Sequence, residues 1–218
     1  MSEDIYFRQP RADMLPLLPQ RYTKVLEIGC GEGLFSAGLD KTAERWGIEP
    51  DAEAAARAQS RLDRVLVCDY FAAKAQLPTG HFDLIICNDV IEHMPDHDAF
   101  LHDIQTYLAP AGVLIASIPN IRYFPVLWEL LVFRDFRYRD SGVLDRTHLR
   151  FFTARSLKRS LQDAGFCIEQ FRMLNPLKMR LTFKRILLLA VTLVTFGAYR
   201  DLWFRQFGVR VRSGSPCA

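Results

Sequence analysis

The segment Val25-Leu26-Glu27-Ile28-Gly29-Cys30-Gly31-Glu32-Gly33 decides the fold of this chain. Its first four residues form a short, mainly apolar run of the kind that becomes a buried strand, and three alternating glycines follow directly. Glycine tolerates left-handed backbone and carries no Cβ, so a ligand can approach the main chain closely there. The segment therefore predicts a strand that ends in a ligand-binding loop.

An acidic residue further along the chain indicates which kind of ligand binds. Glu49 lies 20 residues beyond Gly29, after the apolar segment 46–48. A carboxylate at the end of a second strand can accept both hydroxyls of a ribose, which predicts a nucleoside cofactor. The glycines are spaced G-x-G-x-G rather than the G-x-G-x-x-G typical of dinucleotide loops. A nicotinamide-dependent oxidoreductase is therefore the disfavoured alternative.

Strand-like and helix-like periods alternate along the chain. Helical spacing is clearest at 100–108 and after Thr153, a candidate N-cap. Such alternation predicts an α/β fold, a doubly wound and mostly parallel sheet with helices on both faces, formed by one domain over residues 1–218. Ligands of such sheets bind at the carboxyl ends of the strands. Strands are predicted at 25–28, 45–48, 65–67, 84–87, 113–117, 167–173 and 206–211.

Five motifs in a fixed order resemble those of class I S-adenosylmethionine-dependent methyltransferases. They are the glycine loop, Glu49 in GIEP, Asp69 after the third strand, FDLIICNDVIEHMPD at 82–96 and LAPAGVLIASIPN at 108–120. The resemblance covers about residues 22–170. It implies a seven-stranded Rossmann-like sheet with an antiparallel edge strand, and S-adenosylmethionine as methyl donor. A catalytically silent protein that binds the cofactor for a partner enzyme is a second alternative.

The chemistry of this cofactor assigns roles to several residues. Amides of the glycine loop would approach the amino-acid part and the ribose, Glu49 would accept from the ribose hydroxyls, and Asp69 from the adenine amine. Tyr70 or Phe71 would lie against the adenine ring. Arg11 is the candidate for the cofactor carboxylate, since guanidinium and carboxylate form strong paired hydrogen bonds. The expected cofactor-binding set is Arg11, Glu27, Gly29, Cys30, Gly31, Gly33, Glu49, Pro50, Asp69, Tyr70 and Asn88.

Methyl transfer requires an in-line nucleophile, and a hydroxyl nucleophile also requires a base. His93 and His148 are the candidate catalytic residues, because the other three histidines are expected in solvent.

Asp89, Glu92 and His93 form D-x-x-E-H after the fourth strand. This motif resembles the E-x-x-E-H site of metal-dependent O-methyltransferases acting on ubiquinone precursors or small-RNA ends, with aspartate in first place. In one helical turn the three side chains would project together and hold Mg²⁺. A structural Glu-His pair without metal is the alternative.

Two inserts distinguish the chain from a minimal domain of this kind. The motif DRTHLRFFT at 145–153, preceded by an aromatic insert at about 121–140, resembles a bacterial methyltransferase subgroup associated with cell-surface glycan and lipid biosynthesis. The insert is expected to cap the substrate pocket, with Arg122, Tyr123, Phe124 and Trp128 as lining candidates, or simply to pack onto the domain. A cap of this kind favours a bulky acceptor, a small molecule, a glycan or a lipid-like molecule, methylated at oxygen.

The second insert, at about 176–204, is basic and apolar. Residues 172–212 carry nine Lys or Arg and one Asp, a net charge of +8 in a chain of +3, and residues 186–199 carry no charge. As a helix that run would be about 21 Å long, short of a hydrocarbon core of roughly 30 Å. We expect segment 181–204 to be helical and covered by the domain itself, by a second subunit of a homodimer, or by anionic lipid. A nucleic acid is not expected as partner, because stacking aromatics do not interrupt the charge.

The remaining features concern the compartment. The five cysteines form no C-x-x-C pair and are expected to be reduced thiols. Residues 1–9 lack the pattern of a secretory signal. The sequence thus predicts a cytoplasmic protein, peripheral at the inner face of the membrane if 181–204 meets lipid.

Overall fold

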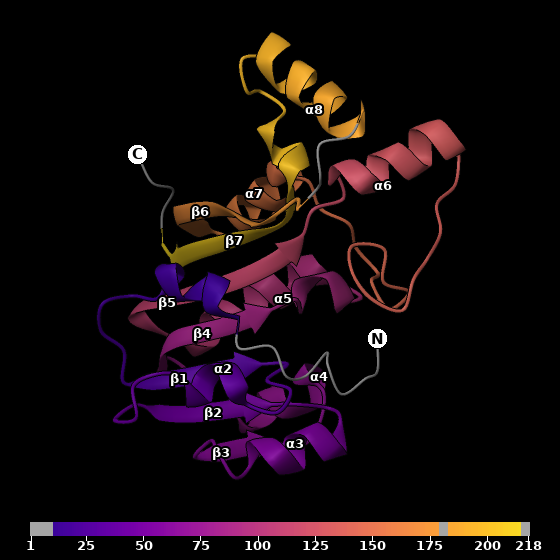
Figure 1. Cartoon of the computed structure of the whole chain (residues 1–218). Coiled ribbons are helices and arrows are strands. Elements are labelled where there is room, and N and C mark those ends of the chain that lie inside the picture. The colour runs from indigo at the N-terminus through magenta and orange to yellow at the C-terminus, as the bar shows by residue number, and fades with distance from the viewer. Residues whose placement is uncertain (1–10, 179–182, 215–218) are drawn as a thin grey trace.

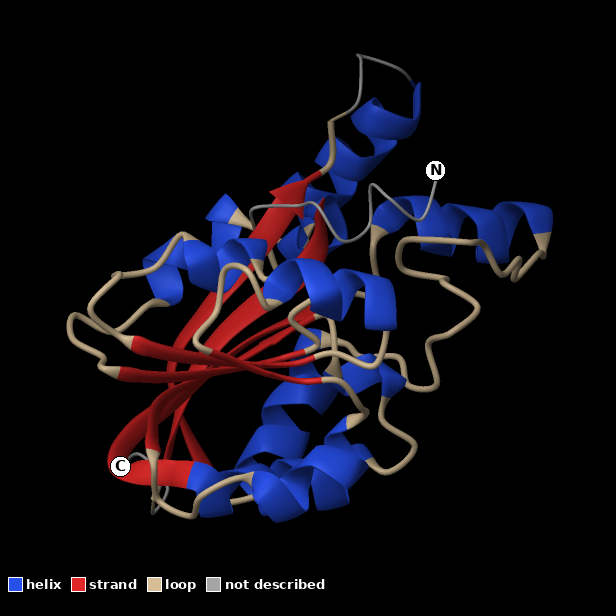
Figure 2. Ribbon diagram, turned by 90° about the horizontal axis from the view of Figure 1, so that it is seen from below, coloured by secondary structure: helices blue, strands red, loops and turns tan. Residues whose placement is uncertain are grey.

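Seven strands form one sheet in the order β3-β2-β1-β4-β5-β7-β6 (Figure 1). The computed structural model describes residues 11–178 and 183–214. Helices cover both faces of the sheet (Figure 2). The strands are β1 (Lys24–Ile28), β2 (Glu44–Ile48), β3 (Arg64–Leu66), β4 (Phe82–Asn88), β5 (Leu108–Pro119), β6 (Phe166–Pro176) and β7 (Phe204–Ser213).

Side-chain caps set the start of four helices. Asp51, Asp69, Asp96 and Thr153 each accept a hydrogen bond from a backbone amide of the first turn, which satisfies a donor that the helix itself leaves unpaired. The helices are α2 (Leu34–Ala37), α3 (Ala52–Ala58), α4 (Tyr70–Ala73), α5 (His97–Ile104), α6 (Phe124–Trp128), α7 (Ala154–Asp163) and α8 (Phe183–Val194). Short 3-10 turns are η1 (Ala12–Leu17), η2 (Lys74–Gln76), η3 (Ile91–His93), η4 (Gln105–Tyr107) and η6 (Arg200–Trp203), and η5 (Glu129–Phe133) is π-helical.

The strand directions confirm the expected fold. β3, β2, β1, β4 and β5 pair in parallel, whereas β7 is antiparallel to both β5 and β6. β6 therefore runs in the same direction as β5. The register places Ile28 of β1 beside Ile48 of β2 and Cys87 of β4. These strands end at one edge of the sheet, so the residues that follow them meet there.

Strand side chains alternate between two apolar layers. Leu26 and Ile85 point into the layer beneath α5 and α7, and Val25 and Leu84 point into the layer beneath η1 and α2. A parallel sheet with both faces covered buries nearly every strand residue. This burial explains why the strands appear in the sequence as apolar runs.

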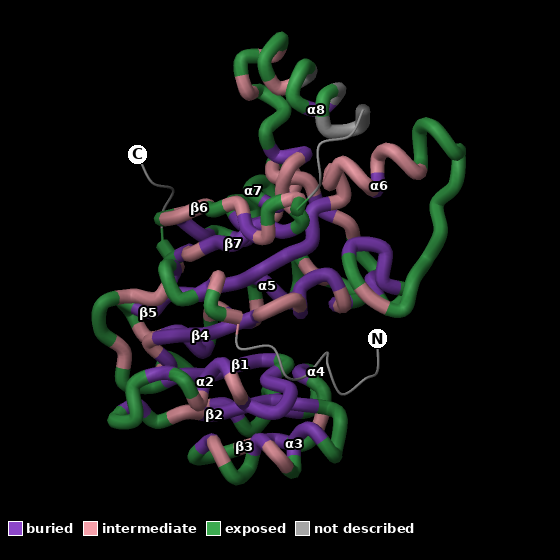
Figure 3. The backbone as a smooth tube through the Cα atoms, in the orientation of Figure 1, coloured by how far each residue is buried: buried purple, intermediate pink, exposed green. Residues whose placement is uncertain are grey.

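Both inserts leave the sheet at the edge where β1, β2 and β4 end. The first insert follows β5 and comprises α6, η5 and the loop to residue 150. The second follows β6 and comprises α8 and η6, after which β7 returns along the sheet. Figure 3 shows that the strands are mostly buried and that much of both inserts is exposed. Within the part of the chain that the structure describes, no helix has the length and apolar character needed to cross a membrane.

The second insert is not one continuous helix through residues 181–204. α8 ends at Val194, and Phe196 and Gly197 both have left-handed backbone, with φ of 50° and 77°. The chain then turns into η6. A left-handed residue cannot continue a right-handed helix, so the apolar run divides into a helix and a turn. Residues 179–182 lie outside the described residues.

The cysteines divide into two groups. Cys30, Cys68 and Cys87 have free thiols. Cys167, on the outer strand β6, is disulfide-bonded, so the prediction of reduced thiols is wrong at this position. Spacing along a sequence does not reveal which cysteines the fold brings together. Cys217 lies outside the described residues.

Candidate functional site

The glycine loop after β1 needs its glycines. Gly29, Gly31 and Gly33 all have left-handed backbone, with φ between 54° and 74°. The amides of Gly29 and Cys30 both donate to the Ile48 carbonyl, over N···O distances of 2.8 and 3.1 Å. A Cβ on Gly29 would lie 2.9 Å from a methyl carbon of Val90. The loop thus turns tightly over the end of β2 and leaves no room for a side chain at its first position.

Glu49, the residue after β2, fixes the same loop. Its Oε2 accepts from the Gly31 amide at 2.7 Å, and its Oε1 accepts from the Asp51 amide at 3.0 Å. The side chain is buried, and this burial raises the pKa of the carboxyl above its ordinary value. Each oxygen retains a lone pair that a ribose hydroxyl can use. Pro50, which follows it, is exposed.

Glu27 connects three elements beneath the loop. One of its oxygens accepts from both the amide and the hydroxyl of Ser36, at 3.2 and 2.6 Å. The other lies 3.5 Å from the side-chain nitrogen of Asn88 at the end of β4. Burial raises the pKa of Glu27 to about 7. Glu27 therefore shapes the loop from inside the fold, and Asn88 carries a buried side-chain oxygen that accepts no hydrogen bond from any described residue.

Arg11 reaches the site from the start of the described chain. Its guanidinium pairs with Asp89 and, through Nε, with Asp13 at 3.3 Å. The third nitrogen, Nη2, is buried and has no hydrogen-bond partner among residues 11–178 and 183–214. Arg11 thus brings one unused donor to Asp89, the residue that follows Asn88 and the end of β4.

Asp89 does not join Glu92 and His93. It has a left-handed backbone, φ 56°, and only residues 91–93 form the short turn η3. Besides its pair with Arg11, its carboxylate accepts from the Ser117 hydroxyl at 2.9 Å and the Gln206 amide at 2.7 Å. The three-residue projection expected of D-x-x-E-H requires a regular helical turn, which this backbone does not form.

The residues expected to bind the adenine differ in how far they are exposed. Asp69 is exposed, and its Oδ1 caps α4. The Tyr70 ring is buried in the core, where its hydroxyl donates to Asp103 at 2.7 Å and its ring packs edge-on against Phe100. Tyr70 therefore cannot lie against an adenine at the surface. Phe71, the other expected ring, is 47% exposed.

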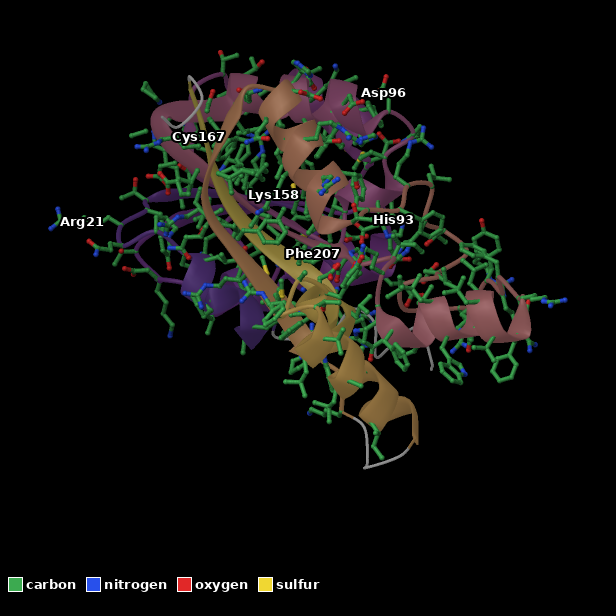
Figure 4. All side chains as sticks on the ribbon, turned by 90° about the horizontal axis from the view of Figure 1, so that it is seen from above. Arg21, His93, Asp96, Lys158, Cys167 and Phe207 are labelled. Carbon is green, nitrogen blue, oxygen red and sulfur yellow. The ribbon has the colours of Figure 1, made fainter. Side chains whose placement is uncertain are left out.

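Glu92, His93 and His148 form a cluster. One possible ligand atom from each lies within 4.8 Å of the other two. The two imidazole rings meet edge to face. Leu149 and Arg150 both donate a backbone hydrogen bond to the Glu92 carbonyl, at 2.9 and 3.0 Å. The loop that carries His148 is thus fastened to η3, which brings together residues that are 56 positions apart in the sequence. Figure 4 places His93 on the side of the molecule from which α6 departs.

The cluster directs three acceptor atoms toward one another. Nδ1 of His148 lies 3.1 Å from the Val143 carbonyl, and Nδ1 of His93 lies 3.1 Å from the Thr147 carbonyl. A carbonyl only accepts, so each Nδ1 carries a proton, and in the neutral ring Nε2 then presents a lone pair. Glu92 is 1% exposed, and neither of its oxygens has a hydrogen-bond partner in the described part of the chain.

Burial controls the protonation of this cluster. It raises the pKa of Glu92 well above its ordinary value, and the neighbouring Asp89 raises it further. It lowers the pKa of His148 below the ordinary value of an imidazole. Both effects disfavour charge. The lowered pKa leaves His148 an unprotonated imidazole near neutral pH, and the raised pKa of Glu92 favours its protonated form when no cation is bound.

The aromatic insert packs only at its base. Val126, Val143 and Leu144 are buried together, and Tyr123 packs against them. Phe124 and Trp128 are half-buried and in ring contact. Beyond them, every residue from 131 to 140 is exposed. An open hollow in this outer part is lined by Arg137, Tyr138, Arg139, Asp140 and Arg146.

Several contacts at the site lack a short-range signal in the sequence. Glu32, in the glycine loop, forms ion pairs with Arg57 and Arg61, at 3.0 and 3.7 Å. Ser117 and Gln206 bind Asp89 from strands far along the chain. These pairings depend on the tertiary fold, so short sequence motifs do not indicate them.

A family model described as "Methyltransferase domain" matches residues 4–170. The ubiquinone biosynthesis O-methyltransferase of Psychrobacter arcticus is 32% identical over 171 residues, covering 72% of this chain and 65% of that protein. A probable S-adenosylmethionine-dependent methyltransferase of Mycobacterium tuberculosis is 32% identical over 168 residues, covering 75% of this chain and 56% of that protein. The chain thus spans less than two thirds of the length of these curated relatives.

Solved structures show the same fold. A methyltransferase from Archaeoglobus fulgidus superposes with a TM-score of 0.63 at 17% identity, over 95% of this chain and 93% of that chain. One from Mesorhizobium loti gives 0.60 at 16% identity, over 92% and 95%. At these identities the likeness concerns the fold alone.

Proposed function

The chain belongs to the class I S-adenosylmethionine-dependent methyltransferases, and we propose that it methylates a hydroxyl oxygen of a small-molecule, glycan or lipid-like acceptor. Membership in this family removes the nicotinamide-dependent alternative. The observation that carries the proposal is the neutral, partly enclosed imidazole of His148 beside Glu92, because a hydroxyl acceptor needs a base. The name of the Psychrobacter arcticus relative also specifies O-methylation.

The residues around the glycine loop fit the methyl donor. S-adenosylmethionine supplies, when bound, a methyl group on a positively charged sulfur. Arg11 offers one unused buried donor to its carboxylate, and Asn88 offers an unused buried acceptor to its ammonium group. Glu49 retains lone pairs for the ribose hydroxyls. Phe71, rather than Tyr70, has the exposed ring that the adenine would contact.

His148 is proposed as the base. Its Nδ1 is held by the Val143 carbonyl, so the lone pair of Nε2 has a fixed direction. The acceptor oxygen bonds to the methyl carbon as the sulfur–carbon bond breaks, and His148 Nε2 takes the hydroxyl proton. His93 packs against the His148 ring and steadies it.

The same cluster supports a second candidate, in which a divalent ion helps to orient the acceptor. Three lone-pair donors converge, and each imidazole donates its other N–H to a backbone carbonyl, as is usual for histidines that bind metal. One carboxylate and two imidazoles suit a transition ion such as Mn²⁺, Fe²⁺ or Zn²⁺ better than Mg²⁺, which prefers oxygen ligands. Asp89 is outside this set because Arg11 and Gln206 bind it.

The experiment is an acceptor search with a matched pair of variants. Isotopically labelled S-adenosylmethionine is incubated with enzyme and with soluble or membrane extracts, and labelled products are identified by mass. The His148→Ala variant should lose about 10²–10⁴-fold in rate, the usual range for a general base. His102→Ala, at an exposed histidine, is the control. Equal labelling by both variants would contradict the role of His148.

A further inference from the structure

We propose that the two inserts together form a docking surface for an anionic lipid bilayer. The surface comprises an insert arm, residues 129–140, and a helix arm, residues 186–200. Twelve of the sixteen large apolar side chains that the described structure exposes lie on these two arms. They are Leu130, Leu131, Val132, Phe133, Phe136, Tyr138, Ile186, Leu189, Leu193, Val194, Phe196 and Tyr199.

The exposure is extensive at the tips of the arms. Leu131 and Phe133 are 73% and 65% exposed, and Val194 and Phe196 are 78% and 99% exposed. Apolar side chains scattered singly over a surface need no explanation, but contiguous groups of this kind usually mark an interaction site. The domain itself covers little of either arm, so burial against its own core does not account for these residues.

The two arms are joined at their bases. Arg122, before α6, pairs with Asp201 of η6 through Nε at 2.8 Å, and its guanidinium lies over the ring of Tyr199. Asn120 at the end of β5 donates to the carbonyls of Asp201 and Phe204, both at 2.9 Å. The arms therefore diverge from one fixed base at the cofactor edge of the sheet, as Figures 1 and 3 show.

The charge of the two inserts that carry the arms fits an anionic surface. Residues 121–150 and 177–205 together carry 12 Lys or Arg and five Asp or Glu, a net charge of +7, which leaves −4 for the rest of the chain. Arg137, Arg139 and Arg146 line the open hollow beside Tyr138. Basic residues next to exposed apolar side chains are the combination by which peripheral proteins bind anionic membranes.

Lipid fits this surface better than a second copy of the chain. In a two-fold dimer the same patch meets itself, so the positively charged inserts of the two copies would face each other. A bilayer offers opposite charge to the cations and an apolar interior to the tips. α8 has 12 residues, about 18 Å as a helix, so it can enter the interface without spanning the bilayer. The proposal is independent of the methyl acceptor, because it concerns where the protein works.

Vesicle sedimentation tests the proposal with the full-length protein. We expect binding to anionic phosphatidylglycerol vesicles and little binding to neutral phosphatidylcholine vesicles. Binding should be weaker at roughly 0.5 M than at roughly 0.1 M salt, because added salt screens the attraction between the basic residues and the anionic lipid. The double variants Leu131→Asp/Phe133→Asp and Val194→Asp/Phe196→Asp should each bind about tenfold more weakly or worse, because they put charge in the apolar tips.

Two controls make the result specific. Leu15→Asp changes an exposed leucine outside the arms, 46% exposed, and this variant should bind vesicles as the wild type does. S-adenosylmethionine affinity and circular dichroism, unchanged in all variants, show that the fold persists. The proposal would be overturned if the wild-type protein did not bind anionic vesicles, or if the arm variants bound them as tightly as the wild type. It would also be overturned if the wild type formed a dimer in solution and the arm variants were monomeric.

Discussion

Nε2 of His148 lies 3.9 Å from Oε1 of Glu92, too far for a hydrogen bond and close enough for both atoms to contact one ion. A buried carboxyl with no hydrogen-bond partner is costly when charged, so it must hold a proton or a cation. This choice decides between a purely protein-based mechanism and a metal-assisted one.

The first prediction separates these two mechanisms. If an ion binds, protein that has been stripped of metal with a chelator should bind one equivalent of Mn²⁺ or Zn²⁺, as measured by calorimetry. Glu92→Gln should weaken this binding at least about tenfold, because the substitution removes an anionic ligand. His102→Ala should leave it unchanged. Full activity after chelation would exclude the ion and leave His148 as the base.

The second prediction concerns pH and stability. Burial raises the pKa of Glu27 to about 7 from an ordinary 4.5. Between these values the folded chain keeps a proton that the unfolded chain has lost, so the contribution of Glu27 to stability falls as pH rises through this window. Glu27→Gln, which keeps an acceptor for Ser36, should remove that contribution. Urea unfolding at pH 5 and pH 8 measures it.

The contribution of His148 to stability changes with pH in the opposite direction over part of the same pH range. Its pKa is lowered, so the unfolded chain binds the extra proton and the contribution of His148 rises with pH up to its ordinary pKa near 6.5. The comparison of wild type with Glu27→Gln cancels this effect. An identical pH dependence in the two proteins would show that Glu27 is not protonated in the folded state.

The third prediction tests the cofactor site. Glu49→Ala should weaken S-adenosylmethionine binding by about 1.5–3 kcal/mol, the range for hydrogen bonds to a charged group. It also releases the Gly31 amide. Glu53→Ala, at an exposed glutamate of α3, is the control. Titration calorimetry measures both, and equal affinities would remove Glu49 from the site.

The fourth prediction compares two glycines with similar backbone. Gly29 and Gly80 have φ of 67° and 61°, but only at Gly29 would a Cβ meet a neighbour within 4 Å. Gly80→Ala should cost about 1–2 kcal/mol of unfolding free energy from left-handed strain alone. Gly29→Ala should cost more, because Val90 must also move. Denaturant unfolding of the two variants tests this difference, and equal costs would mean that the contact with Val90 is easily relieved.

Much of the fold could be predicted from the sequence because buried strands appear there as apolar runs. All seven strands were expected, and all but β3 are longer than the apolar runs that indicated them. β5, for example, extends to Pro119, which pairs with Gln206 of β7. Strand ends depend on partners that are distant in sequence, so apolar runs locate strands better than they define their ends.

The site was less accessible to sequence reasoning. His148 and Glu92 were each selected as candidates, and the structure brings them together. Tyr70 and Phe71 are neighbours in sequence, and only the packing of Tyr70 against Phe100 shows which ring is left for a ligand. The role of Asp89 depended on Arg11, a pairing across 78 positions that no spacing rule describes.

Asp89 also has a consequence for the order of folding. Its carboxylate is shared by the segment before β1, by Ser117 of β5 and by Gln206 of β7. Contacts at such separations form late, because each closes a long loop. A nascent chain can therefore assemble β1 to β5 and still have an incomplete cofactor edge. The edge becomes complete only when the seventh strand inserts between β5 and β6.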